Sequence, residues 1–156
     1  MFSIKIWSVG MSHAQSVIEA VADIETRIQS QAPWDYTAFT ELLTQPSTQL
    51  IVGFIDECVV GYCLYQAIFE QAEILRIGTH PDYQRQGIAS KIFAQLNQDL
   101  IHIEVTSLLL EVRADNYSAI ALYEQQGFAV IHRRRGYYQQ ADLPAIDALI
   151  MQRHYL

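Results

Sequence analysis

The loop Gln84-Arg85-Gln86-Gly87-Ile88-Ala89 places a glycine directly before an apolar segment with helical periodicity. A stretch typical of a strand, Glu73 to Thr79, precedes it, and a second one, Ser107 to Val112, follows the helical segment. The apolar face of the predicted helix is made of Ile88, Ile92, Phe93, Leu96 and Leu100. These elements predict a β-loop-α-β crossover, whose loop lies at the carboxyl end of a strand, where α/β sheets usually bind ligands.

The same loop has the chemistry of an anion site. The first backbone N–H groups of a helix lack internal partners and carry the positive end of its dipole, so they bind phosphate well. The loop lacks both the lysine-serine or lysine-threonine pair of a P-loop and the three-glycine spacing of a dinucleotide fold. Alternatively, Gly87 only eases a turn and Arg85 is a solvated charge.

Periodicity along the rest of the chain predicts five further strands or helices before the crossover and three after it. The expected order is β-α-α-β-β-β-α-β-α-β-β, with Asp56-Glu57 as a hairpin turn and Gly127 as a helix C-terminal cap. The remaining strands are expected at 2–9, 49–55, 59–69, 128–133 and 145–151, and the remaining helices after residue 12, around 39–43 and at 118–126.

Length and composition indicate one folded domain over residues 1–156, since 51% of the residues are hydrophobic and 17% are charged. No apolar run is long enough to span a membrane and no signal peptide is recognised, so a cytoplasmic location and no membrane partner are expected. The net charge of −7 argues against nucleic acid, and Arg133-Arg134-Arg135 is interpreted as a solvated or ion-paired turn. The oligomeric state stays open.

No metal site is expected. The five histidines are scattered, and none stands at a spacing typical of metal ligands. Cys58 and Cys63 lie five residues apart in a predicted strand, which places their thiols on opposite faces and favours neither a disulfide nor a metal site.

Gln84, Gly87 and Ala89 match the signature Q/R-x-x-G-x-G/A, and the chain therefore resembles the GNAT superfamily of N-acetyltransferases. It is most similar to the RimI group, the ribosomal-protein-alanine N-acetyltransferases. This resemblance implies an α/β (α+β) fold, with a mixed, mostly antiparallel central sheet of about seven strands flanked by about four helices. The shared motifs include Pro81-Asp82-Tyr83, Leu110-Glu111-Val112-Arg113-Ala114, Asn116, Ala121-Leu122-Tyr123-Glu124, Gly127-Phe128, Tyr137-Tyr138 and Ala148-Leu149-Ile150-Met151.

The resemblance also implies two catalytic roles. Glu111 would accept the proton of the acceptor amine, directly or through water, and Tyr123 would donate a proton to the coenzyme A thiolate. Two ordinary structural roles remain as alternatives. Glu111 could pair with Arg113 on the same strand face, and Tyr123 could be a core aromatic at helical spacing from Ile120.

Acetyl-coenzyme A is the co-substrate that the resemblance implies. The backbone of Ile77, Gly78 and Thr79 would pair with its pantetheine arm and polarise the acetyl carbonyl. Asn116 would contact the coenzyme, although an N-cap of the next helix is an equally good interpretation. The residues expected around the pyrophosphate are Arg85, Gln86, Gly87, Ile88, Ala89 and Ser90.

The acceptor is the least determined part of the prediction. The α-amino group of a basic protein N-terminus is expected, in particular the N-terminal alanine of a small-subunit ribosomal protein. The chain departs from the RimI group at Arg76, Gly78, Thr79 and His80, where Asn-Ile-Ala-Val-Asp is usual and only Ile77 is retained. A GNAT enzyme for a small amine or another protein therefore stays open, as does a coenzyme A-binding module without turnover.

Overall fold

The computed structural model describes residues 1–156 except 8–10, 12, 30–31 and 156, and the described residues form seven strands and four α-helices in the expected order. A single 3₁₀ turn, η1 (Pro81–Tyr83), precedes the third helix. The strands are β1 (Phe2–Trp7), β2 (Thr48–Ile55), β3 (Cys58–Ile68), β4 (Gln71–Thr79), β5 (Ser107–Arg113), β6 (Ala129–Tyr138) and β7 (Ile146–His154). The α-helices are α1 (Ala14–Ile28), α2 (Tyr36–Leu43), α3 (Ile88–His102) and α4 (Tyr117–Gln125).

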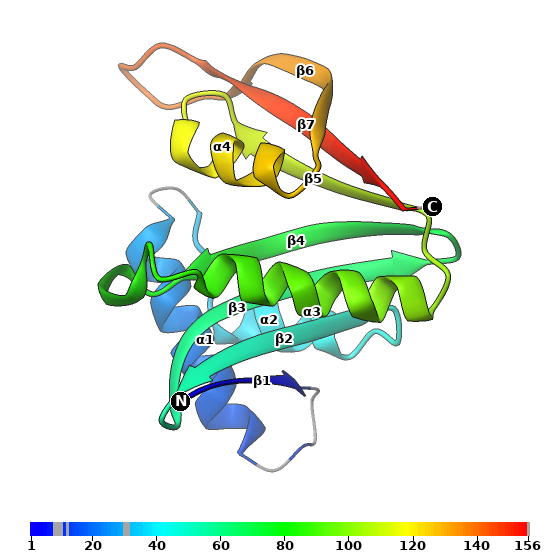
Figure 1. Ribbon diagram of the computed structural model, residues 1–156. Coiled ribbons are helices and arrows are strands. Elements are labelled where there is room, and N and C mark those ends of the chain that lie inside the picture. The colour runs from blue at the N-terminus through cyan, green and yellow to red at the C-terminus, as the bar shows by residue number, and fades with distance from the viewer. Residues whose placement is uncertain (8–10, 12, 30–31, 156) are drawn as a thin grey trace.

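The strands form one mixed, mostly antiparallel sheet in the order β1-β2-β3-β4-β5-β7-β6. Among the described strands, only the pairing of β4 with β5 is parallel, which confirms the predicted crossover through α3. Figure 1 shows α3 across one face of the sheet and α1 and α2 behind the other, with β5, α4, β6 and β7 grouped at the upper end.

The strands alternate between two hydrophobic cores because successive side chains point to opposite faces of a sheet. Ile51 and Cys63 pack into the core beneath α3, whereas their neighbours Leu50 and Leu64 pack into the core beneath α1 and α2. The molecule thus has three layers, and helices of both outer layers reach the same end of β4.

β4 and β5 separate after a short paired stretch, and this separation positions the functional site. Their parallel register covers only Gln71 to Glu73 on β4. Beyond it, β4 continues to pair with β3 up to Thr79, while β5 continues to pair with β7 up to Arg113. The β4 backbone from residue 74 onward therefore has one edge without a strand partner among the described residues, beside the carboxyl half of β5.

Several boundaries differ from the sequence-based expectations; β4 begins at Gln71 rather than Glu73, and β7 ends at His154 rather than Met151. β1 is described over Phe2–Trp7, and the last two residues expected for it lie outside the described part. β6 was expected to end at Arg133 but continues to Tyr138, because two register shifts against β7 and an exposed outer face obscure the apolar alternation. Among the described helices, none has the length and apolar character needed to cross a membrane.

Candidate active site

The loop before α3 has an unusual backbone conformation that leaves its amides exposed. Arg85 and Gly87 both adopt positive φ, at 62° and 78°, and no side chain caps the N-terminus of α3. A Cβ at Gly87 would meet no atom within 4 Å, so the space beside this backbone is open. The first N–H groups of α3 therefore face a space that an anionic group can enter.

A cavity of about 650 Å³ lies against this loop. Its wall combines the loop, the end of β4 and the first turn of α4. Nine of the ten residues expected to bind the coenzyme line it, and Gln86 does not. The nine are Ile77, Gly78, Thr79, Arg85, Gly87, Ile88, Ala89, Ser90 and Asn116.

Gly78 is a glycine for a packing reason. A Cβ at this position would overlap Cδ1 of Ile28 and come within 2.8 Å of the Tyr62 hydroxyl. Helix α1 therefore approaches the β4 backbone closely beside the larger cavity. This contact explains one of the departures noted in the sequence.

A second cavity, of about 240 Å³, extends between β4 and β5. Charged and aromatic side chains from four elements line it, among them Arg76, Glu111 and Tyr138. Four residues belong to the walls of both cavities, and Tyr123 is one of them; the other three are Gln29, Ile77 and Asn116. The two cavities thus adjoin, with Tyr123 at their junction.

Tyr123 is a core aromatic, as one of the two interpretations predicted, and it also lines both cavities. Its side chain is buried and packs in the core against Phe93 and Phe128, with ring centroids 6.1 and 6.0 Å apart. Burial raises the pKa of the Tyr123 phenol well above its usual range. The hydroxyl therefore keeps its proton near neutral pH, as a proton donor must until the leaving group needs it.

Glu111 does not pair with Arg113, the partner considered as an alternative to its catalytic role. Arg113 donates two hydrogen bonds to Asp115, each 3.1 Å long, so its pairing with Glu111 is wrong. Glu111 Oε1 instead lies 3.7 Å from Arg134 Nη1 and accepts no hydrogen bond. The carboxylate thus retains an oxygen that can accept a proton.

The negative charge of Glu111 affects the pKa of two neighbouring groups. Burial first, and then the charge of Glu111, raise the pKa of Glu73 and that of Tyr138. Arg76 and Arg113 act in the opposite direction on Tyr138. Negative and positive side chains therefore face each other across the smaller cavity.

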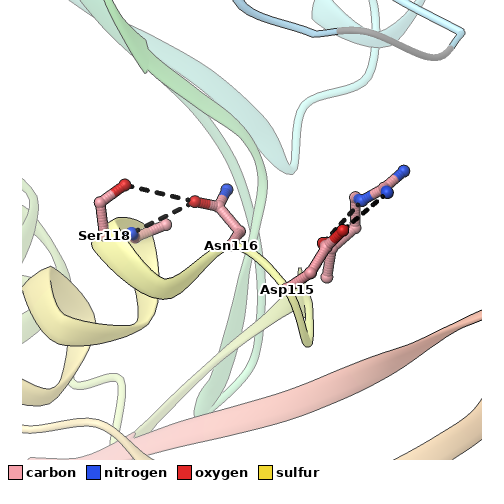
Figure 2. A network of polar contacts seen from close by, with 5 residues as sticks. Asp115, Asn116 and Ser118 are labelled. Atoms are coloured by element: carbon pink, nitrogen blue, oxygen red, sulfur yellow. Dashed lines mark hydrogen bonds and ion pairs between the residues drawn. The ribbon is translucent and has the colours of Figure 1, made fainter.

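Asn116 is the N-cap of α4, as one of the two interpretations predicted. Its Oδ1 accepts hydrogen bonds from the Ala119 N–H at 3.3 Å and the Ser118 hydroxyl at 3.5 Å (Figure 2). The amide nitrogen points away from both partners. Because Asn116 also lines both cavities, the cap leaves its N–H₂ group available for a ligand.

Sequence reasoning assigned no role to a buried carboxylate behind the smaller cavity. Glu25 is fully buried, and it accepts hydrogen bonds from the Tyr62 hydroxyl at 2.5 Å and the Trp34 N–H at 3.0 Å. Its position on the apolar face of α1, next to Ile24, was the available signal, because a lone acidic residue there needs buried partners. Among the described residues, no group of His, Cys, Asp and Glu could hold a metal ion.

Comparison with known proteins adds to this geometry. Residues 15–128 match the model of the acetyltransferase (GNAT) family. The ribosomal protein bS18-alanine N-acetyltransferase of Escherichia coli (strain K12) is 40% identical over 93 residues, which are 60% of this chain and 62% of that protein. A putative enzyme of the same name from Bacillus subtilis (strain 168) is 30% identical over 135 residues, covering 86% of this chain and 87% of that protein.

A crystal structure of the Escherichia coli ribosomal-protein-S18-alanine N-acetyltransferase has the same fold. It superposes with a TM-score of 0.86 at 30% identity and covers 99% of this chain and 94% of that one. The sequence match to the curated Escherichia coli protein spans less than two thirds of its length, whereas the structural match spans nearly all of both chains.

Proposed function

The chain belongs to the acetyltransferase (GNAT) family, and from this membership and the site geometry we propose that it transfers the acetyl group of acetyl-coenzyme A to the α-amino group of a protein N-terminus. The observation that carries the proposal is the position of Tyr123 between a cavity with an exposed helix N-terminus and a cavity lined by the Glu111 carboxylate. Two substrates can then meet at one proton donor.

The larger cavity suits the coenzyme. The amides at the start of α3 would bind its pyrophosphate, and the unpaired β4 edge at Ile77 to Thr79 would hydrogen-bond its pantetheine arm. When bound, acetyl-coenzyme A supplies an activated thioester. A volume of about 650 Å³ is within the range of ligand pockets, which run from about 300 to 1,000 Å³.

The smaller cavity suits the amine. The attacking amine must be neutral, and the Glu111 carboxylate, whose Oε1 accepts no hydrogen bond from the described residues, would take its proton. A free α-amino group has a pKa of about 7.7–8.0, so one carboxylate is sufficient near neutral pH. As the carbon–sulfur bond breaks, the Tyr123 hydroxyl would donate its proton to the departing sulfur.

We further propose that the acceptor is the N-terminal alanine of a small-subunit ribosomal protein. Support comes from the relatives in Escherichia coli and Bacillus subtilis, whose names specify the alanine of ribosomal protein bS18. The net charge of −7 complements a basic acceptor.

The test is thiol release from acetyl-coenzyme A by the purified protein with three acceptors. These are a peptide beginning Ala-Arg, a peptide whose only amine is a lysine side chain, and a polyamine. Release with the first peptide alone is expected. Release only with the polyamine would replace the acceptor with a small amine, and coenzyme binding without any release would favour a non-catalytic module.

A further inference from the structure

A buried ion pair holds Arg76 in the wall of the smaller cavity. Arg76 Nε lies 3.4 Å from Oε2 of the fully buried Glu25, and the guanidinium carbon stands 4.5 Å from the centroid of the Trp34 ring. Glu25 is in turn held by the Tyr62 hydroxyl and the Trp34 N–H. The guanidinium is therefore held between Glu25 of α1 and the Trp34 ring in the segment before α2, and Tyr62 of β3 holds Glu25 in place.

The guanidinium still has hydrogen bonds to give. Its Nε is buried beside Glu25 Oε2, whereas the side chain as a whole is 24% exposed and lines the smaller cavity, so the terminal N–H₂ groups are the donors left for a ligand. A guanidinium carries five N–H donors in a rigid plane and no acceptor. Because stacking and ion pairing already fix its orientation, a ligand oxygen can bind it without a further large loss of side-chain entropy.

The other charges around the cavity leave Arg76 as the natural donor for an oxygen. Arg113 is occupied by Asp115, and Arg134 stands next to Glu111. Glu111 and Arg76 line the same cavity as Tyr138, and their charges shift the pKa of the Tyr138 phenol in opposite directions. The cavity thus offers a carboxylate for an amine and a guanidinium for an oxygen.

We propose that Arg76 determines acceptor specificity by donating hydrogen bonds to the carbonyl oxygen of the acceptor's first residue while Glu111 receives the amine proton. This inference rests on the proposed function. In an α-aminoacyl group the amine and the carbonyl oxygen are separated only by Cα and the carbonyl carbon, so both fit a cavity of about 240 Å³. A lysine side chain or a polyamine carries no oxygen in that place and would be bound less well.

The alternative is a purely structural ion pair that fastens α1 to β4. That role predicts a loss of stability when Arg76 is replaced, with the same preference among acceptors. Acceptor choice, measured separately from stability, distinguishes the two roles.

The experiment is a double-mutant cycle between Arg76 and one atom of the acceptor. Peptides beginning Ala-Arg would be compared with the same peptides carrying a thioamide at the first peptide bond, because sulfur accepts hydrogen bonds weakly. The wild-type enzyme should lose about tenfold in kcat/KM with the thioamide, and Arg76→Met about ten- to a hundredfold with the normal peptide. Arg76→Met should then lose little more with the thioamide.

Three controls keep the result interpretable. Arg27→Met removes an arginine of α1 that lines neither cavity and pairs with Asp23, and it should discriminate like the wild type. Arg76→Lys keeps the positive charge, and it should retain part of the wild-type preference for the normal peptide over the thioamide peptide. The melting temperature and the KM for acetyl-coenzyme A report folding and the coenzyme site of each variant.

Two outcomes would overturn the inference, and they differ from each other. If Arg76→Met turns over both peptides with the wild-type ratio, Arg76 has no role in reading the acceptor, although the proposed function stands. If the wild-type enzyme acetylates neither peptide while it acetylates a polyamine, the proposed acceptor class is wrong and this role fails with it.

Discussion

The two adjoining cavities are built in different ways. The larger one presents backbone: two positive-φ residues, an uncapped helix N-terminus and an unpaired strand edge. The smaller one presents side chains from α4, β4, β5 and β6, held by a buried carboxylate and ion pairs. Backbone shape suits a constant ligand, whereas side chains can change from one relative to another. The difference implies that the coenzyme site is general and the acceptor site is particular to this chain.

Tyr123 belongs to both cavities, and its loss should have the largest effect. Tyr123→Phe keeps the core packing against Phe93 and Phe128 but removes the proton donor. We expect kcat to fall at least about a hundredfold, with acetyl-coenzyme A affinity unchanged, as measured by steady-state kinetics and calorimetry. Tyr117→Phe, on the same helix but exposed and outside both cavities, is the matched control. An unchanged kcat in Tyr123→Phe would remove its acid role.

Glu111 tests the acceptor side alone. Glu111→Gln should lower kcat/KM about tenfold near pH 7, a smaller effect because the amine pKa of about 7.7–8.0 already leaves part of the acceptor neutral. The defect should shrink as the pH rises above the amine pKa, since fewer amines then need a base. Glu124→Gln, an exposed carboxylate of α4, should show a wild-type pH profile. A defect in Glu111→Gln that stays constant from pH 6.5 to 9 would contradict the base role.

The elements that bury one face could be predicted from sequence. Helices α1 and α3 carry their buried apolar residues at helical spacing, and the order of all elements was confirmed. The end of the exposed strand β6 could not be predicted, because apolar and polar residues alternate along a strand only where one of its faces is buried. The Asp56-Glu57 turn followed from local chemistry and has positive φ at both residues, as a tight hairpin requires.

The candidate site could likewise be predicted from sequence only where local signals encode it. Local backbone signals identified the loop before α3, and nine of the ten expected coenzyme residues line one cavity. The contact of Arg76 with Glu25 joins residues 51 positions apart, and no local pattern encodes such a pairing. The partner of Glu111 was missed for the same reason, since Arg134 reaches it from another strand.

Gly87 tests the backbone character of the larger cavity. Gly87→Ala meets no steric obstacle, but a φ of 78° costs an alanine about 1–2 kcal/mol. We expect the KM for acetyl-coenzyme A to rise about fivefold as the loop relaxes, with the acceptor KM unchanged. Gly136→Ala carries a similar strain, at φ 60°, in a strand that contributes only Tyr138 to the smaller cavity. It should lower the melting temperature without changing the coenzyme KM; equal KM values for both variants would contradict the loop's role.

Asn116 should give the smallest effect, because only half of its amide is proposed to meet the coenzyme. Its Oδ1 caps α4, whereas its nitrogen is free beside both cavities (Figure 2). Asn116→Ser retains a capping oxygen, so stability should be nearly unchanged while the acetyl-coenzyme A KM rises about threefold. Asn116→Ala should show the same KM change plus a stability loss of about 1 kcal/mol, measured by chemical denaturation. A serine variant with wild-type KM would make Asn116 a cap alone, and the coenzyme would then be held at this corner by backbone groups only.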